Sequence, residues 1–170
     1  MKKNNNDRGI MIVDDDSDNF IIFGEILRAN GFENDFVYCS DGLEMIDHLH
    51  NGNGRNKKNS PLPELILLDL NMPNMDGRQA LKIIRNNRSW RHIPVIVLTS
   101  SIDPQDMDYC FRTGANAFIN KFQEFQLLVD NLIDTVKTCI YKSGSVHGRM
   151  SHPHSASPSP QSAGEREQQT

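Results

Sequence analysis

Residues 65–71 read Leu-Ile-Leu-Leu-Asp-Leu-Asn, a run of apolar side chains that ends in an acidic one. Residues 65–68 do not alternate with polar residues, which indicates a strand covered on both faces. Two other runs have the same character, Ile-Met-Ile-Val at 10–13 and Val-Ile-Val-Leu at 95–98. Strands of this kind are typical of a parallel sheet with helices on both sides.

Amphipathic stretches alternate with these runs along the chain. Two weaker strands are expected at 35–39 and 116–119, where short β-favouring segments lie between turn or helix signals. We expect helices at about 17–30, just after Ser40-Asp41, at 76–87, at 104–113 and after the fifth strand. The order predicts an α/β protein with a (βα)5 fold, a doubly wound five-stranded parallel sheet of the flavodoxin-like type.

The apolar residues of the first helix and of the last helix predict which of their faces points inward. The first is expected to bury Phe20, Phe23, Ile26 and Leu27, with Gly31 as a left-handed cap. The fifth has the clearest helical spacing of apolar residues. Those residues are Phe125, Leu128, Val129, Leu132, Ile133, Val136 and Ile140.

The chain length and local composition suggest one folded domain with polar flanks. A chain of 170 residues is near the usual single-domain size. We expect a flexible N-terminus at 1–8, a folded domain at 9–141 and a disordered tail at 142–170, which is rich in Ser, Pro, His and Gln and has no Leu, Ile or Phe. Residues 51–63, with their turn formers and basic side chains, are expected to form an exposed loop.

Charge and hydropathy exclude several classes of protein. The 18 Lys and Arg residues against 22 Asp and Glu give a formal net charge of −4, which argues against binding to nucleic acid. The polar start of the chain and the lack of a long apolar run predict a cytoplasmic protein with no membrane partner. Three scattered cysteines do not suggest a disulfide framework.

Acidic residues and their potential partners follow the ends of the predicted strands. Asp14, Asp15, Asp69, Thr99 and Lys121 come after or at the end of four different strands. Ligands of such sheets bind at the carboxyl ends of the strands, so these side chains should converge. Two carboxylates about 4 Å apart repel by roughly 4 kcal/mol at an effective dielectric near 20. Lys121 and a hard divalent cation, for which we expect Mg²⁺, would compensate for that repulsion.

This cluster could support phosphoryl chemistry. Next to a cation, Asp69 becomes a potential nucleophile toward phosphorus, and Thr99 and Lys121 are suitable donors to phosphoryl oxygens. The run Asp14–Asp16 could also be explained by its favourable position at the N-terminus of the first helix.

Four segments of the chain resemble the receiver domains of two-component response regulators. They are IMIVDDDSDN, LILLDLNMPNMDG, IPVIVLTSS and GANAFINK, and the resemblance spans about residues 8–141. The basic loop before the third strand and the stretch IIRNNRSWRHIPVIVLTSS are similar to single-domain regulators found with bacterial phytochromes. The resemblance implies a sensor histidine kinase as partner, and the likeness to the phytochrome-associated regulators implies one of the phytochrome type.

The resemblance also implies roles for the acidic residues. Asp69 matches the aspartate that accepts phosphate from the kinase. Asp15 matches the direct carboxylate ligand of Mg²⁺, and Asp14 matches the ligand that usually acts through water. Asn71 matches the residue whose backbone carbonyl completes the metal shell.

The resemblance further implies a conformational switch read by another protein. Thr99 matches the switch hydroxyl, Lys121 the phosphate-binding lysine, and Phe118 the aromatic rotamer switch. On the residues alone, Phe118 could equally be a core ring. The output is expected to be an unknown downstream protein, and two copies could pair through helix-five residues such as Leu128 or Ile140.

The chain departs from the family pattern after the lysine. Receivers usually have a cis proline there, whereas this chain has Phe122. A cis bond before a non-proline residue costs about 2.5–4 kcal/mol, so we expect a trans bond, with some displacement of the lysine or of the fifth helix. Asn71, Ser100 and Ser101 are small polar residues that would leave a phosphoryl group open to water, which suggests a short or moderate lifetime.

Three alternatives remain open from the sequence. The first is a small phosphohydrolase with an aspartate nucleophile, although such enzymes generally place that nucleophile after the first strand. The second is a flavodoxin-like cofactor binder, although no phosphate-binding loop follows residues 10–13. The third is a receiver fold that acts as a docking module without phosphorylation, which Phe122 keeps open.

Overall fold

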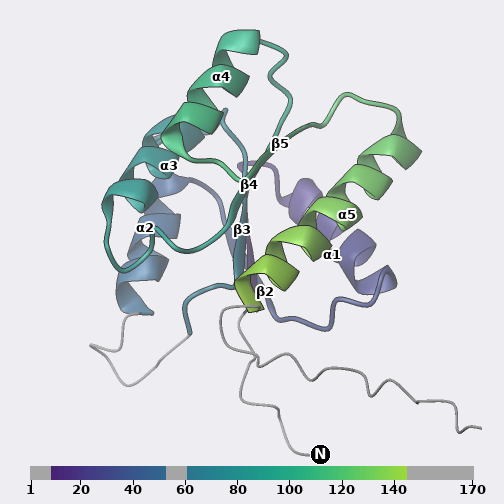
Figure 1. Ribbon diagram of the computed structural model, residues 1–170, viewed down its shortest axis with the longest axis horizontal. Helices are drawn as coiled ribbons and strands as arrows, with labels where there is room; N and C mark the ends of the chain where they lie inside the picture. Colours follow the sequence, from purple (N-terminus) through teal and green to yellow (C-terminus); the bar gives the residue numbers. More distant parts are fainter. Residues whose placement is uncertain (1–8, 53–60, 145–170) are drawn as a thin grey trace, which may run out of the picture.

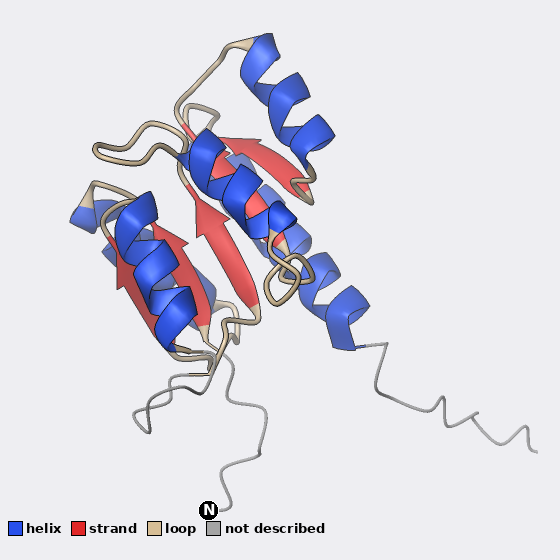
Figure 2. Cartoon of the chain, turned by 90° about the vertical axis from the view of Figure 1, so that its left-hand side faces the viewer, coloured by secondary structure: helices blue, strands red, loops and turns tan. Residues whose placement is uncertain are grey.

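The computed structural model describes residues 9–52 and 61–144, and in these ranges the chain forms a five-stranded parallel sheet. The strand order is β2-β1-β3-β4-β5, and all strand arrows in Figure 2 point the same way. The strands are β1 (Ile10–Val13), β2 (Phe36–Cys39), β3 (Leu65–Leu68), β4 (Val95–Thr99) and β5 (Ala117–Asn120). This confirms the predicted fold class.

Five helices cover the two faces of the sheet. One face carries α1 (Ser17–Ala29) and α5 (Phe125–Gly144), as Figure 1 shows. The other carries α2 (Gly42–Asn51), α3 (Gly77–Asn86) and α4 (Pro104–Thr113). None of the helices in the described ranges combines the length and hydropathy needed to cross a bilayer.

Alternate strand residues point to opposite faces and build two separate cores. Ile10 and Ile12 pack with Phe23 and Leu27 of α1 and with residues of α5. Met11 and Val13 of the same strand pack on the opposite side, toward α2, α3 and α4. Because both faces are covered, β1, β3 and β4 are fully buried, as their unbroken apolar sequence predicts.

Aspartates determine where four of the helices begin. The side chains of Asp16, Asp41, Asp76 and Asp103 each accept a hydrogen bond from a backbone N–H in the first helical turn. These bonds satisfy donors that have no partner inside the helix. As each of these loops follows a strand, capping also holds the loops at the carboxyl end of the sheet.

Several predicted boundaries and faces need correction. The strand expected at 116–119 lies at 117–120, because the Asn116 side chain accepts the Val95 N–H at the point where the ladder would begin. Phe125 was expected to face inward, but it is 62% exposed, and Leu128, one turn later, reaches the core. Gly31 has φ 88°, as expected for a left-handed cap.

The ends of the folded domain differ from the expectation only in part. Helix α5 continues through Gly144, beyond the expected boundary at 141, and Asn51 belongs to α2 and not to the following loop. The expected flexible N-terminus at 1–8, most of the loop (53–60) and the rest of the tail (145–170) lie outside the described residues.

Gly77 allows α3 to start directly against the end of β3. A Cβ atom at this position would lie 1.9 Å from the Asp69 carbonyl oxygen. We expect Gly77→Ala to lower the free energy of unfolding by about 3 kcal/mol, because backbone atoms must move apart. Urea unfolding followed by circular dichroism measures this loss.

Gly24 offers a matched control inside α1. A Cβ there meets only the Arg28 side chain, at 3.6 Å. Gly24→Ala should therefore leave stability unchanged or raise it by up to about 1 kcal/mol, since alanine favours helix. Equal losses in the two variants would contradict the role given to Gly77.

Candidate functional site

The register of β1 and β3 brings two acidic side chains together. Val13 pairs with Leu68, so Asp14 and Asp69 follow at the same level of the sheet. The Asp69 N–H donates to the Val13 carbonyl oxygen at 2.9 Å. Both carboxylates are almost fully buried, with 2% and 5% of each residue exposed. The site therefore lies at the carboxyl end of adjacent central strands.

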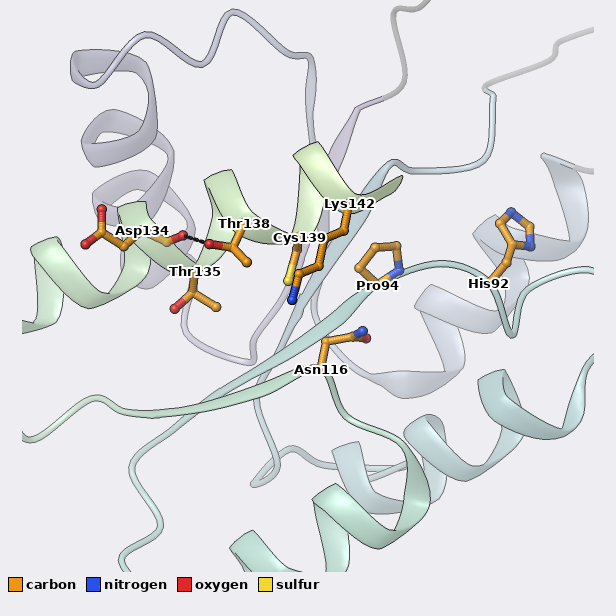
Figure 3. A pocket seen from close by; sticks show the side chains of 8 residues that line it. All are labelled: His92, Pro94, Asn116, Asp134, Thr135, Thr138, Cys139 and Lys142. Carbon is orange, nitrogen blue, oxygen red and sulfur yellow. Dashed lines mark hydrogen bonds between the residues drawn. The ribbon is translucent and has the colours of Figure 1, made fainter. Parts of the chain in front are cut away.

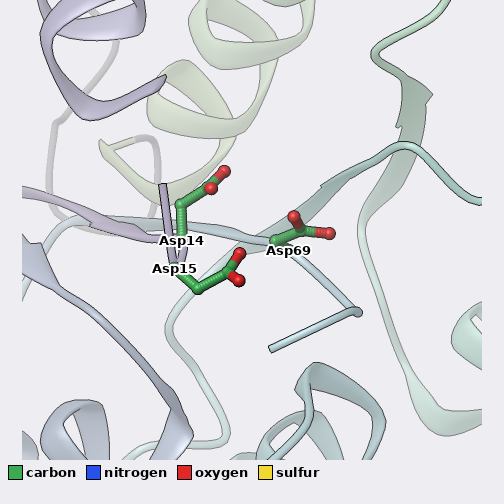
Figure 4. A group of neighbouring side chains, drawn as sticks. All are labelled: Asp14, Asp15 and Asp69. Atoms are coloured by element: carbon green, nitrogen blue, oxygen red, sulfur yellow. The ribbon is translucent and has the colours of Figure 1, made fainter. Parts of the chain in front are cut away.

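Asp15 completes an acidic cluster with Asp14 and Asp69 (Figure 4). One carboxylate oxygen from each of the three residues lies within 4.8 Å of the others, and Asp15 is exposed. Hard divalent cations prefer such oxygen ligands, so these residues fit a metal site open to solvent on the Asp15 side. Asn71, expected to add its carbonyl, lies nearby in the loop and donates its N–H to Asp69 Oδ1 at 3.3 Å.

Lys121 joins the two buried carboxylates. Its Nζ atom donates to Asp14 Oδ2 at 2.6 Å and to Asp69 Oδ2 at 2.7 Å. Burial alone would lower the pKa of Lys121, but the two hydrogen-bonded carboxylates outweigh it and raise the pKa above its ordinary value. The ammonium is therefore charged and directly compensates for the repulsion between the acids.

The backbone after β5 delivers Lys121 through trans peptide bonds. No cis bond occurs in the described ranges, so the prediction of a trans Lys121-Phe122 bond is confirmed. The Phe122 N–H donates to the Asn120 side chain at 2.6 Å, a bond that proline could not make. The Gln123 side chain donates to the Asn120 carbonyl at 2.8 Å. The lysine thus reaches both acids without the usual proline.

The other oxygens of the buried acids have partners near in sequence. Asp69 Oδ1 accepts the Leu70 N–H at 2.6 Å. Asp14 Oδ1 accepts from the Asp16 N–H at 3.1 Å and from Asn19 Nδ2 at 3.0 Å. Asn19 is a site residue that the sequence analysis missed. The sequence did contain a signal for it, because Asn19 is an amide in the first turn of α1, the helix that follows the acidic residues after β1.

Thr99 and Phe118 lie on the neighbouring strands. Thr99 is the last residue of β4 and fully buried, and its Oγ1 accepts the Ser101 N–H at 3.2 Å. Thr99 and Asp69, both within the described ranges, share no hydrogen bond. Phe118 is half-buried and packs against the core on the α2–α3–α4 side. Ser100 and Ser101, which follow Thr99 in the sequence, are half-buried.

Two loops around the site are tied together by a contact that the sequence analysis did not foresee. Asn74 Nδ2, in the β3–α3 loop, donates to Asp41 Oδ2 at 2.6 Å. Asn74 itself adopts a left-handed conformation with φ 58°, which asparagine tolerates. Hydrogen bonds from the Glu44 N–H and from Asn74 lower the pKa of Asp41. This contact braces the loop that carries Asn71.

A cavity elsewhere in the molecule is separate from this site. It has a volume of about 480 Å³ and is lined by α5 residues, including Asp134, Thr138 and Lys142, and by Pro94 and Asn116 (Figure 3). Pro94 and Asn116 immediately precede β4 and β5, so the cavity lies at the amino end of the sheet, opposite the acidic cluster.

Comparison with known proteins agrees with this geometry. Residues 10–133 match the sequence model of the response regulator receiver domain. The chain belongs to this family. That membership identifies it as a receiver domain of two-component signalling.

Named relatives of this receiver are response regulators. It is 33% identical to response regulator Rcp1 of Synechocystis sp. over 112 residues, which cover 66% of this chain and 75% of that protein. It is 28% identical to the polar-differentiation response regulator DivK of Brucella ovis, covering 77% and 94% of the two chains.

Solved structures show the same likeness. The phosphorylated cyanobacterial phytochrome response regulator RcpA superposes with a TM-score of 0.70 at 28% identity, covering 79% of this receiver and 95% of that chain. The Mn²⁺-bound form of Rcp1 gives 0.66 at 29% identity, with coverage of 75% and 90%.

Replacing Lys121 should destabilise the receiver. Lys121→Met leaves two buried carboxylates without a cation, and we expect a loss of about 3–5 kcal/mol in the free energy of unfolding. Lys137→Met, on the exposed side of α5, is the matched control and should change stability little. Urea unfolding in a chelating buffer measures both. Equal stability of the two variants would contradict the bridging role of Lys121.

The raised pKa of Lys121 predicts that the stability difference between wild type and Lys121→Met depends on pH. The folded pKa of Lys121 is raised above the ordinary 10.5, so its contribution is complete below pH 10.5 and is lost as the pH rises through the raised value. The stability difference between wild type and Lys121→Met should therefore shrink above pH 10.5. Urea unfolding across this alkaline range tests the prediction, and a constant difference would refute it.

Proposed function

We propose that this receiver domain accepts a phosphoryl group on Asp69 from a histidine kinase and passes the signal to a protein partner. The observation that carries the proposal is the position of Asp69. Its Oδ2 atom lies 2.7 Å from Lys121 Nζ, beside the carboxylates of Asp14 and Asp15. A nucleophilic carboxylate next to a cation and a metal-binding acid pair is suited to phosphoryl transfer.

The residues that would hold the metal are Asp14, Asp15, Asp69 and the backbone carbonyl of Asn71. Their oxygen-only chemistry favours Mg²⁺, and the Mn²⁺-bound Rcp1 structure supports divalent-metal binding in a related protein. A bound Mg²⁺ supplies positive charge that stabilises the oxygens of the transferred group. Asp15 is the most exposed of the three acids and is the ligand through which an ion would enter.

In the proposed step, an Asp69 carboxylate oxygen attacks the phosphorus of a phosphohistidine. A P–O bond forms as the P–N bond breaks, and the imidazole nitrogen keeps the electron pair and takes up a proton. Lys121 stabilises the charge on the phosphoryl oxygens. Hydrogen bonds from the Leu70 and Asn71 N–H groups hold the Asp69 carboxylate in place throughout.

The proposed response involves Thr99 and Phe118. The Thr99 hydroxyl would turn toward the phosphoryl group and release space that the Phe118 ring can fill. Phe118 is half-buried, so a modest shift changes its exposure. This repacking would alter the surface formed by α4, β5 and α5, which a partner protein could read.

Similarity to phytochrome response regulators supports a kinase of that class as the phosphoryl donor. Asn71 is exposed and Ser100 and Ser101 are half-buried, which supports an acyl phosphate of short to moderate lifetime. Leu128 is buried and Ile140 packs against the same core, so these two side chains are not available to pair two copies through α5.

Labelling with acetyl phosphate tests the phosphoacceptor. Wild type with Mg²⁺ should gain one phosphoryl group by intact mass, and the gain should disappear with a chelator and in Asp69→Asn. The control Asp47→Asn removes an exposed carboxylate on α2 and should leave labelling unchanged. Labelling of Asp69→Asn at the wild-type level would disprove the proposal.

The same experiment separates signalling from hydrolysis. A signalling receiver should release phosphate only slowly, at the rate of its self-dephosphorylation. It should not hydrolyse a range of phosphomonoesters rapidly. Sustained fast turnover would instead favour the phosphohydrolase alternative. A folded protein that neither binds Mg²⁺ nor becomes labelled would favour a docking module.

A further inference from the structure

An ion pair outside the acidic cluster connects two helices beside the site. Arg78 lies in the first turn of α3 and Asp106 in the first turn of α4. Arg78 Nε donates to Asp106 Oδ1 at 2.7 Å, and a second bond joins Nη2 to Oδ2. The side chains are 28% and 15% exposed, so water screens this pair less than a surface pair. Two parallel bonds also fix its geometry.

The ion pair continues through Ser101 to Thr99. Ser101 Oγ donates to Asp106 Oδ2, the same oxygen that Arg78 Nη2 contacts. The Ser101 N–H donates to Thr99 Oγ1 at 3.2 Å. A continuous chain of hydrogen bonds therefore runs from α3 through α4 and the β4–α4 loop to the hydroxyl of Thr99.

Electrostatics favour the charged form of this pair. The Arg78 hydrogen bond is the main reason why the pKa of Asp106 is lowered, and Ser101 adds to the effect. The bond to Asp106 likewise raises the pKa of Arg78. Across the ordinary pH range the connection stays intact, so its strength does not depend on a titration near neutrality.

We propose that Arg78, Asp106 and Ser101 form a latch that holds the β4–α4 loop, and with it Thr99, in the position of the unphosphorylated receiver. This inference rests on the proposed function, since it assigns regulation to the same site. Thr99 Oγ1 accepts the Ser101 N–H at 3.2 Å, so turning this hydroxyl toward a phosphoryl group on Asp69, as the proposed function requires, would disturb its bond to the loop. The loop that contacts this hydroxyl is anchored to α3, and the anchor opposes the movement.

Weakening the latch should therefore favour the phosphorylated-like conformation. A ligand can shift a two-state equilibrium only by its differential affinity for the two states. If the latch stabilises the unphosphorylated state, then its loss raises the population that binds a phosphoryl analogue tightly. The change should appear in affinity, whereas a purely structural contact would affect only unfolding.

The test measures binding of beryllofluoride with Mg²⁺, a stable analogue of the aspartyl phosphate, by calorimetry. Arg78→Met keeps the aliphatic length and removes the charge, and it should bind the analogue roughly fivefold or more tightly than wild type. Ser101→Ala keeps the ion pair and cuts its link to the loop, so it should shift affinity in the same direction. Urea unfolding confirms that each variant is folded.

Arg112→Met is the matched control. It breaks the exposed ion pair between Arg112 and Asp108, 3.1 Å apart on the same helix α4. Unlike Asp106, neither residue of this pair bonds to Ser101. Its affinity should equal that of wild type. Unchanged or weaker binding in both Arg78→Met and Ser101→Ala would overturn the latch.

The outcome also separates this inference from the proposed function. If acetyl phosphate labels Asp69 in wild type and both latch variants bind the analogue like wild type, then the latch is wrong and the phosphoacceptor stands. If wild type is neither labelled nor able to bind the analogue, the proposed function fails and the latch fails with it.

Discussion

The ammonium of Lys121 lies between two buried carboxylates, and the geometry of the site depends on that contact. Asp14 and Asp69 end adjacent strands at the same level, where their charges would otherwise repel. One cation that bonds both of them makes the arrangement stable and leaves Asp15 as the exposed side of the cluster. The Asp69 carboxylate is therefore held next to a positive charge at the open end of the sheet.

The surrounding structure supports this contact from several directions. The trans turn at 120–122 delivers the lysine, backbone N–H groups hold the Asp69 carboxylate, and Gly77 lets α3 begin against the end of β3. Packing and the geometry of the site are coupled here, because a side chain at position 77 would push on the backbone of Asp69. The site is thus part of the core and not an addition to its surface.

In the proposed switch, two sets of contacts compete for Thr99. One set runs through Ser101 to the ion pair of Arg78 and Asp106, and the other would form with a phosphoryl group on Asp69. The balance between them determines how readily the receiver responds. This view requires only that the β4–α4 loop has two positions of similar free energy.

The sequence by itself determined the fold class, the order of elements and the acidic strand ends, because buried strands need unbroken apolar runs and parallel strands end at one side. It predicted Asp14, Asp15, Asp69 and Lys121 as neighbours, and it anticipated the trans bond before Phe122 from the cost of a cis one. Only the tertiary structure decided which atoms meet. Lys121 bonds an acid 107 residues away, Asp41 meets Asn74 across 33 residues, and Arg78 meets Asp106 across 28. Such contacts depend on loop conformations and side-chain rotamers, which no local periodicity encodes.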